Sequence, residues 1–79
     1  MTGAKVDNLR RLIAKRPFVP FTIHTVDGGA MRVPTGDHIH VTPTGNRIFV
    51  DFDDGSYDTI LPLMISRVTV EEQANGSTG

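Results

Sequence analysis

Apolar residues recur every three or four positions near the start of the chain. Val6, Leu9 and Ile13 follow this spacing together with Leu12, which places their side chains along one side of an α-helix. The pattern predicts a helix over about residues 5–16. Pro17 ends it, because a proline restricts the preceding residue to extended conformations.

From Phe21 onward, short segments of alternating apolar and polar residues are separated by turns at nearly even intervals, each containing a glycine: Gly28, Gly36, Gly45 and Gly55. This spacing is typical of an antiparallel meander that closes into a small sandwich or barrel. The dipeptides Asp27-Gly28 and Asp54-Gly55 predict tight hairpins with positive φ at both central turn positions.

The alternation also predicts which side chains face the core. In the first three strands they are Phe21, Ile23, Met31, Val33, Ile39 and Val41. The fourth strand, residues 47–53, is apolar on both faces. If Ile48, Val50 and Phe52 point inward, Phe49 needs cover from the helix or from another subunit, which makes Phe49 a candidate interface residue. A fifth strand is expected over residues 56–61 and a last one within residues 63–70, after a break at Pro62.

The length and composition limit the chain to one small domain. Its 79 residues suffice for a single core, which we expect over residues 1–70, and the polar residues 71–79 predict a disordered tail. The chain contains no cysteine, which excludes disulfides and thiolate chemistry. Its apolar stretches are too short to span a bilayer, and its start lacks a signal sequence. We therefore expect a cytoplasmic protein with no membrane partner.

Basic residues gather in the predicted helix. Positions 1–16 hold five of them against one acid, a net charge of +4, and the rest of the chain holds three against eight acids, a net charge of −5. The five are Lys5, Arg10, Arg11, Lys15 and Arg16. Such asymmetry marks either a nucleic-acid-binding element or a solvated helix face.

Few residues have side chains and spacing suited to metal binding or catalysis. His38 and His40 lie two apart on one predicted strand, and His24 or Asp37 would have to supply a third metal ligand. No metal-binding motif supports the site, so these histidines are weak metal candidates and otherwise surface residues. The acidic run over residues 51–58 fails the calcium-loop spacing. No nucleophile elbow or phosphate-binding loop is present. We expect no enzyme activity and no cofactor.

The stretch Arg16-Pro17-Phe18-Val19-Pro20-Phe21-Thr22-Ile23-His24-Thr25-Val26-Asp27-Gly28 resembles the RPFxPFxIHxxDG pattern of a family of short bacterial proteins with no established activity. The resemblance covers about residues 9–70. The chain departs from the family pattern at Pro34-Thr35-Gly36-Asp37, where a histidine-proline-acid run is usual, and at Asn46 before Arg47. The resemblance implies a fold and no activity.

The layout is also similar to that of Sm-like (Hfq-type) RNA-binding barrels. Asp27-Gly28, Asp37-His38-Ile39 and Ile65-Ser66-Arg67-Val68 carry this resemblance. Leu61-Pro62-Leu63-Met64 stands where such proteins have RNA-contacting residues. Together these observations predict a mainly β, α+β fold, in which an N-terminal helix precedes a five- to six-stranded antiparallel meander closing into a small Sm-like or SH3-like barrel.

Three functional hypotheses follow from the sequence. The first is a non-catalytic binding and assembly module that self-associates through exposed strand edges and Phe49, with a protein or RNA partner. The alternative is an Sm-like RNA-binding protein that uses the five basic residues of the helix. The third hypothesis, a metal-dependent or hydrolytic site built from the three histidines across a subunit boundary, has the least support.

Overall fold

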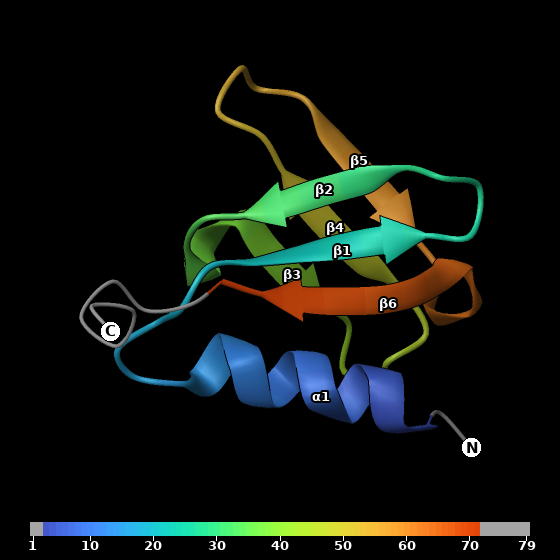
Figure 1. Ribbon diagram of the computed structural model, residues 1–79, viewed down its shortest axis with the longest axis horizontal. Helices are drawn as coiled ribbons and strands as arrows, with labels where there is room; N and C mark the ends of the chain where they lie inside the picture. The colour runs from blue at the N-terminus through green and yellow to red at the C-terminus, as the bar shows by residue number, and fades with distance from the viewer. Residues whose placement is uncertain (1–2, 72–79) are drawn as a thin grey trace.

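The computed structural model describes residues 3–71, which form one α-helix, six strands and two 3-10 helices (Figure 1). In chain order the elements are α1 (Gly3–Ala14), β1 (Phe21–Thr25), β2 (Ala30–Val33), η1 (Gly36–His38), β3 (Ile39–Val41), β4 (Ile48–Asp51), β5 (Tyr57–Ile60), η2 (Pro62–Met64) and β6 (Ile65–Val70). Of the predicted tail, residues 72–79 lie outside the described residues.

The predicted N-terminal helix is confirmed, with its bounds shifted two residues toward the N-terminus. Its last helical residue is Ala14, because Pro17 excludes Arg16 from helical geometry. The Arg16 guanidinium donates hydrogen bonds to the carbonyls of Ile13 and Lys15, both at 2.9 Å, and so satisfies acceptors that the helix end leaves open.

The strands form two separate antiparallel sheets, so the predicted barrel is wrong. One sheet has the order β2-β1-β6 and the other has the order β3-β4-β5. A closed meander would pair β2 with β3 and β5 with β6, and neither pairing occurs among residues 3–71. The fold is α+β with two three-stranded sheets.

Two prolines interrupt the chain where it passes from one sheet into the other. Pro34 directly follows β2, and Pro62 begins η2 after β5. Proline has no N–H for a strand ladder. After Pro34, the Thr35 hydroxyl accepts a hydrogen bond from the Asp37 N–H and caps η1. Each 3-10 helix thus turns the chain out of one sheet and into the other.

The core lies between the two sheets and α1, and the predicted alternation is largely confirmed. The buried cluster comprises Leu9, Phe21, Ile23, Met31, Val33, Ile39, Ile48, Val50, Ile60 and Ile65. Three predicted inward residues, Leu12, Val41 and Phe52, are only partly buried and pack against its margin. Ile23 illustrates the register, since it lies opposite Met31 on β2 and opposite Val68 on β6.

Both predicted hairpins form, but with a different turn. Gly28 and Gly55 have φ of 94° and 92°, and no other residue type among those described has positive φ. In the first hairpin the Gly28 N–H donates to the Thr25 carbonyl, and the Thr25 N–H donates to the Gly29 carbonyl. This is a three-residue loop in which only the glycine is left-handed, so the predicted positive φ at Asp27 and Asp54 is wrong.

Helix α1 lies along β6, on the opposite side of the molecule from β2 (Figure 1). The Lys5 ammonium donates to the Ile65 carbonyl on β6 at 2.6 Å. Farther along the helix, Arg10 donates to the carbonyls of Thr42 and Pro43, just after β3, at 3.0 and 3.1 Å. The helix therefore covers the side of the molecule that is formed by β6 of one sheet and β3 of the other. Within residues 3–71, no helix has the length and apolarity to cross a membrane.

Candidate functional site: an open seam between the sheets

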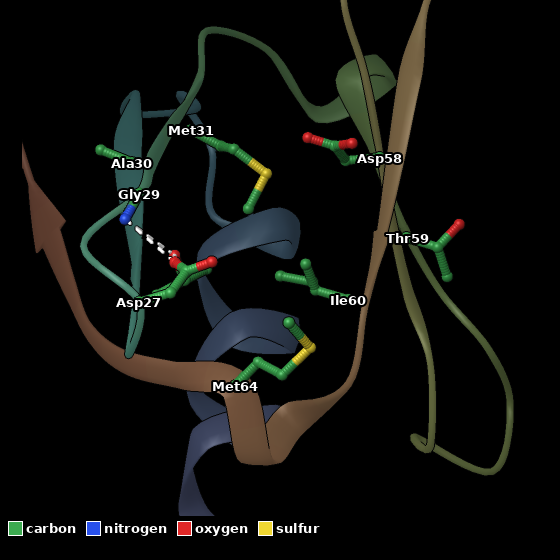
Figure 2. A pocket seen from close by; sticks show the side chains of 9 residues that line it. Asp27, Gly29, Ala30, Met31, Asp58, Thr59, Ile60 and Met64 are labelled. Carbon is green, nitrogen blue, oxygen red and sulfur yellow. Dashed lines mark hydrogen bonds between the residues drawn. The ribbon is translucent and has the colours of Figure 1, made fainter.

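The side of the molecule away from α1 is hollowed by a cleft of about 290 Å³ between β2 and β5. We call this cleft, with the two strand edges that flank it, the open seam. Figure 2 shows Met31, Ile60 and Met64 pointing into it from β2, β5 and η2. The carboxylate of Asp27 enters from one side and that of Asp58 lies across the cleft.

Both strands that border the seam are edge strands. Within the described residues, β2 pairs only with β1 and β5 pairs only with β4. Backbone groups of alternate residues on an edge strand point away from its one neighbour. The seam therefore offers unpaired backbone donors and acceptors from both sheets, above an apolar floor.

Asp27 is held by its own turn. Its carboxylate accepts hydrogen bonds from the Thr25 hydroxyl and, at 3.1 Å, from the Gly29 N–H. These two hydrogen bonds lower the pKa of Asp27, the one from Thr25 having the larger effect. The Asp27 carboxylate is therefore ionised at neutral pH.

Asp58 is an acid on the inner side of an edge strand. It lies opposite Val50, a buried core residue of β4, and cross-strand partners share one face of a sheet. An inward-pointing charge on an edge strand opposes pairing with a like strand. The residues that line the seam include Asp27 and Asp58 but neither lysine nor arginine, so the seam is acidic.

Exposed apolar side chains lie at one end of the seam. Leu63 in η2 is 88% exposed, and Val26 in the β1–β2 turn is 67% exposed. A hydrogen bond of 2.9 Å from the Val26 N–H to the Met64 carbonyl joins this turn to η2. These residues provide apolar surface beside the acidic rim.

The five basic residues predicted to bind nucleic acid do not form one cationic surface. Lys5, Arg10 and Arg16 donate hydrogen bonds to backbone carbonyls of their own chain. Arg11 and Lys15 lie on the exposed side of α1 and make no side-chain hydrogen bond or ion pair within residues 3–71. Two of the five cations therefore remain available to a partner.

The three histidines do not come together. His24 on β1 bonds to the Thr69 hydroxyl on β6, whereas His40 on β3 faces Asp51 on β4 at 3.5 Å. His38 belongs to η1 rather than to a strand. No cluster of three or more potential metal-ligating side chains occurs among residues 3–71, so the weak metal candidates gain no support from the geometry.

His38 joins a chain of three side chains. One ring nitrogen contacts the Thr35 hydroxyl at 2.7 Å, and the other contacts the Asp53 carboxylate at 2.7 Å. The order hydroxyl, imidazole, carboxylate is that of a nucleophilic triad. Here, however, the Thr35 hydroxyl also caps η1 through the Asp37 N–H, and the Asp53 side chain is 90% exposed. We interpret these hydrogen bonds as a structural link between η1 and the β4–β5 hairpin.

Phe49 is half-buried on the outer face of β4, with His40 and Thr59 as its cross-strand neighbours. It is not part of the buried core cluster. Its role as an interface residue remains a prediction.

Comparison with protein-family models, with curated proteins and with solved structures gives no match for this chain. The two motif resemblances therefore stay predictions.

The seam was not predicted from the sequence, because the expected meander pairs each strand with the next strand along the chain. Pro34 and Pro62 were the available signals, since each stops a strand ladder. The inward position of Asp58 was a further signal, because its alternation with Ile60 places a charge on the core side of β5.

Proposed function

We propose that this protein is a non-catalytic binding module that assembles with further copies of itself through the open seam. The proposal rests on one observation: two edge strands that have no second strand partner among residues 3–71 flank an open cleft with an apolar floor. Unpaired edges and exposed apolar surface are the features through which small β-rich domains associate.

The lining of the seam favours binding over catalysis. Thr25 supplies a hydroxyl group there, whereas Thr59 lies on the outer face of β5 and points away from the cleft (Figure 2). The lining contains no histidine or lysine to activate the Thr25 hydroxyl. The Thr25 hydroxyl already donates to Asp27 and accepts from the Gly29 N–H. The seam thus provides a concave binding surface that carries carboxylate charges.

The RNA-binding alternative has less support. Phosphate contacts supply most of the affinity in such proteins, and three of the five candidate cations already bond to their own chain.

A blocked seam tests the proposal. Because the chain has no cysteine, Asp58→Cys can be modified at one site with a bulky maleimide after folding. We expect modified Asp58→Cys to run as a monomer in light scattering, while unmodified wild-type protein shows a larger mass. Tyr57→Cys, modified in the same way, is the matched control, because Tyr57 is an exposed residue of the same strand outside the seam lining.

The control should assemble as the wild type does. If modified Asp58→Cys keeps the wild-type mass at every concentration, the seam is not the contact and the proposal is wrong.

A further inference from the structure

Helix α1 already shows how this protein holds a helix against its own sheets, through one strand and one connecting loop. On the side that faces its own sheets, cationic side chains donate to backbone carbonyls. Lys5 bonds to Ile65 and Arg10 bonds to Thr42 and Pro43, while Leu9 fills the core beneath the helix. Charge-assisted hydrogen bonds of this kind are stronger than neutral ones.

The opposite side of α1 carries a second set of the same groups. Arg11 and Lys15 are four residues apart and so lie together on the helix surface. With Asn8, Leu12 and Ala14 they border a shallow hollow of about 450 Å³. This outer face therefore offers two cations beside a partly buried leucine.

The open seam has the complementary chemistry. It presents the carboxylates of Asp27 and Asp58, the edges of two strands that have no further strand partner within residues 3–71, and an apolar floor that includes Met31 and Met64. Lysine and arginine side chains only donate hydrogen bonds, and their aliphatic stems pack on apolar surface. The Arg11 and Lys15 cations of the helix face and the carboxylates of the seam therefore have opposite charge.

Pairing of one seam with the seam of another copy is disfavoured. It would bring the acidic rim of one copy, Asp27 and Asp58, against the same acids of the other copy, and close like charges destabilise a contact. The complementary charge lies at the far side of the molecule, on α1.

We propose that the Arg11–Lys15 face of α1 in one copy docks in the open seam of the next copy. The inference rests on the proposed self-association and specifies its geometry. Since α1 lies on the opposite side of the molecule from β2 (Figure 1), and β2 flanks the seam, each copy uses two different surfaces. Such head-to-tail contacts produce rings or filaments rather than simple two-fold dimers.

Charge-reversed variants test this arrangement. The helix variant carries Arg11→Glu and Lys15→Glu, and the seam variant carries Asp27→Asn and Asp58→Lys. The amide introduced by Asp27→Asn retains an acceptor oxygen for the turn. Each variant alone should be monomeric by light scattering, because its two contact surfaces then have the same sign.

An equimolar mixture of the two variants should recover the wild-type mass, since each helix then meets a seam of opposite sign. Circular dichroism of the separate variants establishes that both fold. The matched control carries Arg47→Glu and Arg67→Glu, the same charge change as in the helix variant, at exposed positions off α1. It should assemble as the wild type does.

The possible results separate this inference from the proposed function. If wild-type protein assembles and the helix variant assembles equally well, the docking of α1 is wrong and self-association stands. If both variants are folded and their mixture stays monomeric, the docking is also wrong. Assembly that disappears on ribonuclease treatment would assign the Arg11–Lys15 face to RNA and overturn the inference. A wild-type monomer at all concentrations removes both proposals.

Discussion

Three leucines with graded exposure test whether α1 is an integral part of the fold. Leu9 is fully buried, Leu12 is partly buried and Leu63 is 88% exposed. Truncation of a buried leucine to alanine removes its transfer free energy and leaves a cavity, a loss of about 2–5 kcal/mol. Alanine is also the best helix former, so a loss of stability in Leu9→Ala would report packing and not helix propensity.

We expect Leu9→Ala to lower the free energy of unfolding by about 3 kcal/mol. In a domain of this size each kcal/mol shifts Tm by about 4–8 °C, so Tm should fall by about 10–25 °C. Leu12→Ala should lower the free energy by about half as much, and Leu63→Ala should change it by less than about 0.5 kcal/mol. Urea denaturation followed by circular dichroism measures all three.

Equal losses for Leu9→Ala and Leu63→Ala would refute this reasoning, because burial would then not set the energetic cost. A small loss for Leu9→Ala with an unchanged Tm would show that α1 contributes little to the stability of the sheets. The packing of α1 on the sheets would then protect the core no better than the uncovered open seam does.

Two further predictions concern turns and charges. Gly55→Ala should lower the free energy of unfolding by about 1 kcal/mol, because an L-residue is strained at the φ of 92°. Gly36 does not have positive φ, so Gly36→Ala should change the free energy by less than about 0.5 kcal/mol. Urea denaturation measures both variants. Hydrogen bonds lower the pKa values of Asp27, Asp54 and Glu71. These three carboxylates therefore stabilise the folded state above the ordinary carboxyl pKa, and the stabilisation is lost as pH falls below about 4. Thermal unfolding from pH 7 to pH 2 should show this decline, and a Tm that is constant below pH 4 would contradict it.

The elements of the fold follow from local patterns in the sequence. The spacing of Val6 and Leu9 predicts the buried stripe of α1, and alternation predicts Phe21 and Ile23 as core residues. These predictions hold because side-chain direction is set by the backbone period within each element. They require no knowledge of which elements become neighbours.

The pairing of the strands could not be predicted in the same way. It depends on contacts between residues far apart in the chain, such as Ile23 with Val68. Pro34 and Pro62 predict breaks, but a break does not specify whether the next strand returns to the same sheet. The closed barrel was therefore the wrong choice between two arrangements with the same local signals.

The roles of the basic residues were also beyond the sequence. Arg10 and Arg11 are adjacent and chemically identical, yet Arg10 bonds to the carbonyls after β3 and Arg11 lies on the exposed side of α1. A rotation of about 100° per residue around the helix separates them. Only the packing of α1 decides which cation faces its own sheets.

The native mass of the wild-type protein, followed by light scattering across a dilution series at low and high salt, tests the central claim most directly. We predict a mass well above the 8.6 kDa of one chain at high concentration, falling toward 8.6 kDa on dilution and with added salt, which screens the charges. A mass of 8.6 kDa at every concentration and salt level would contradict assembly through the open seam.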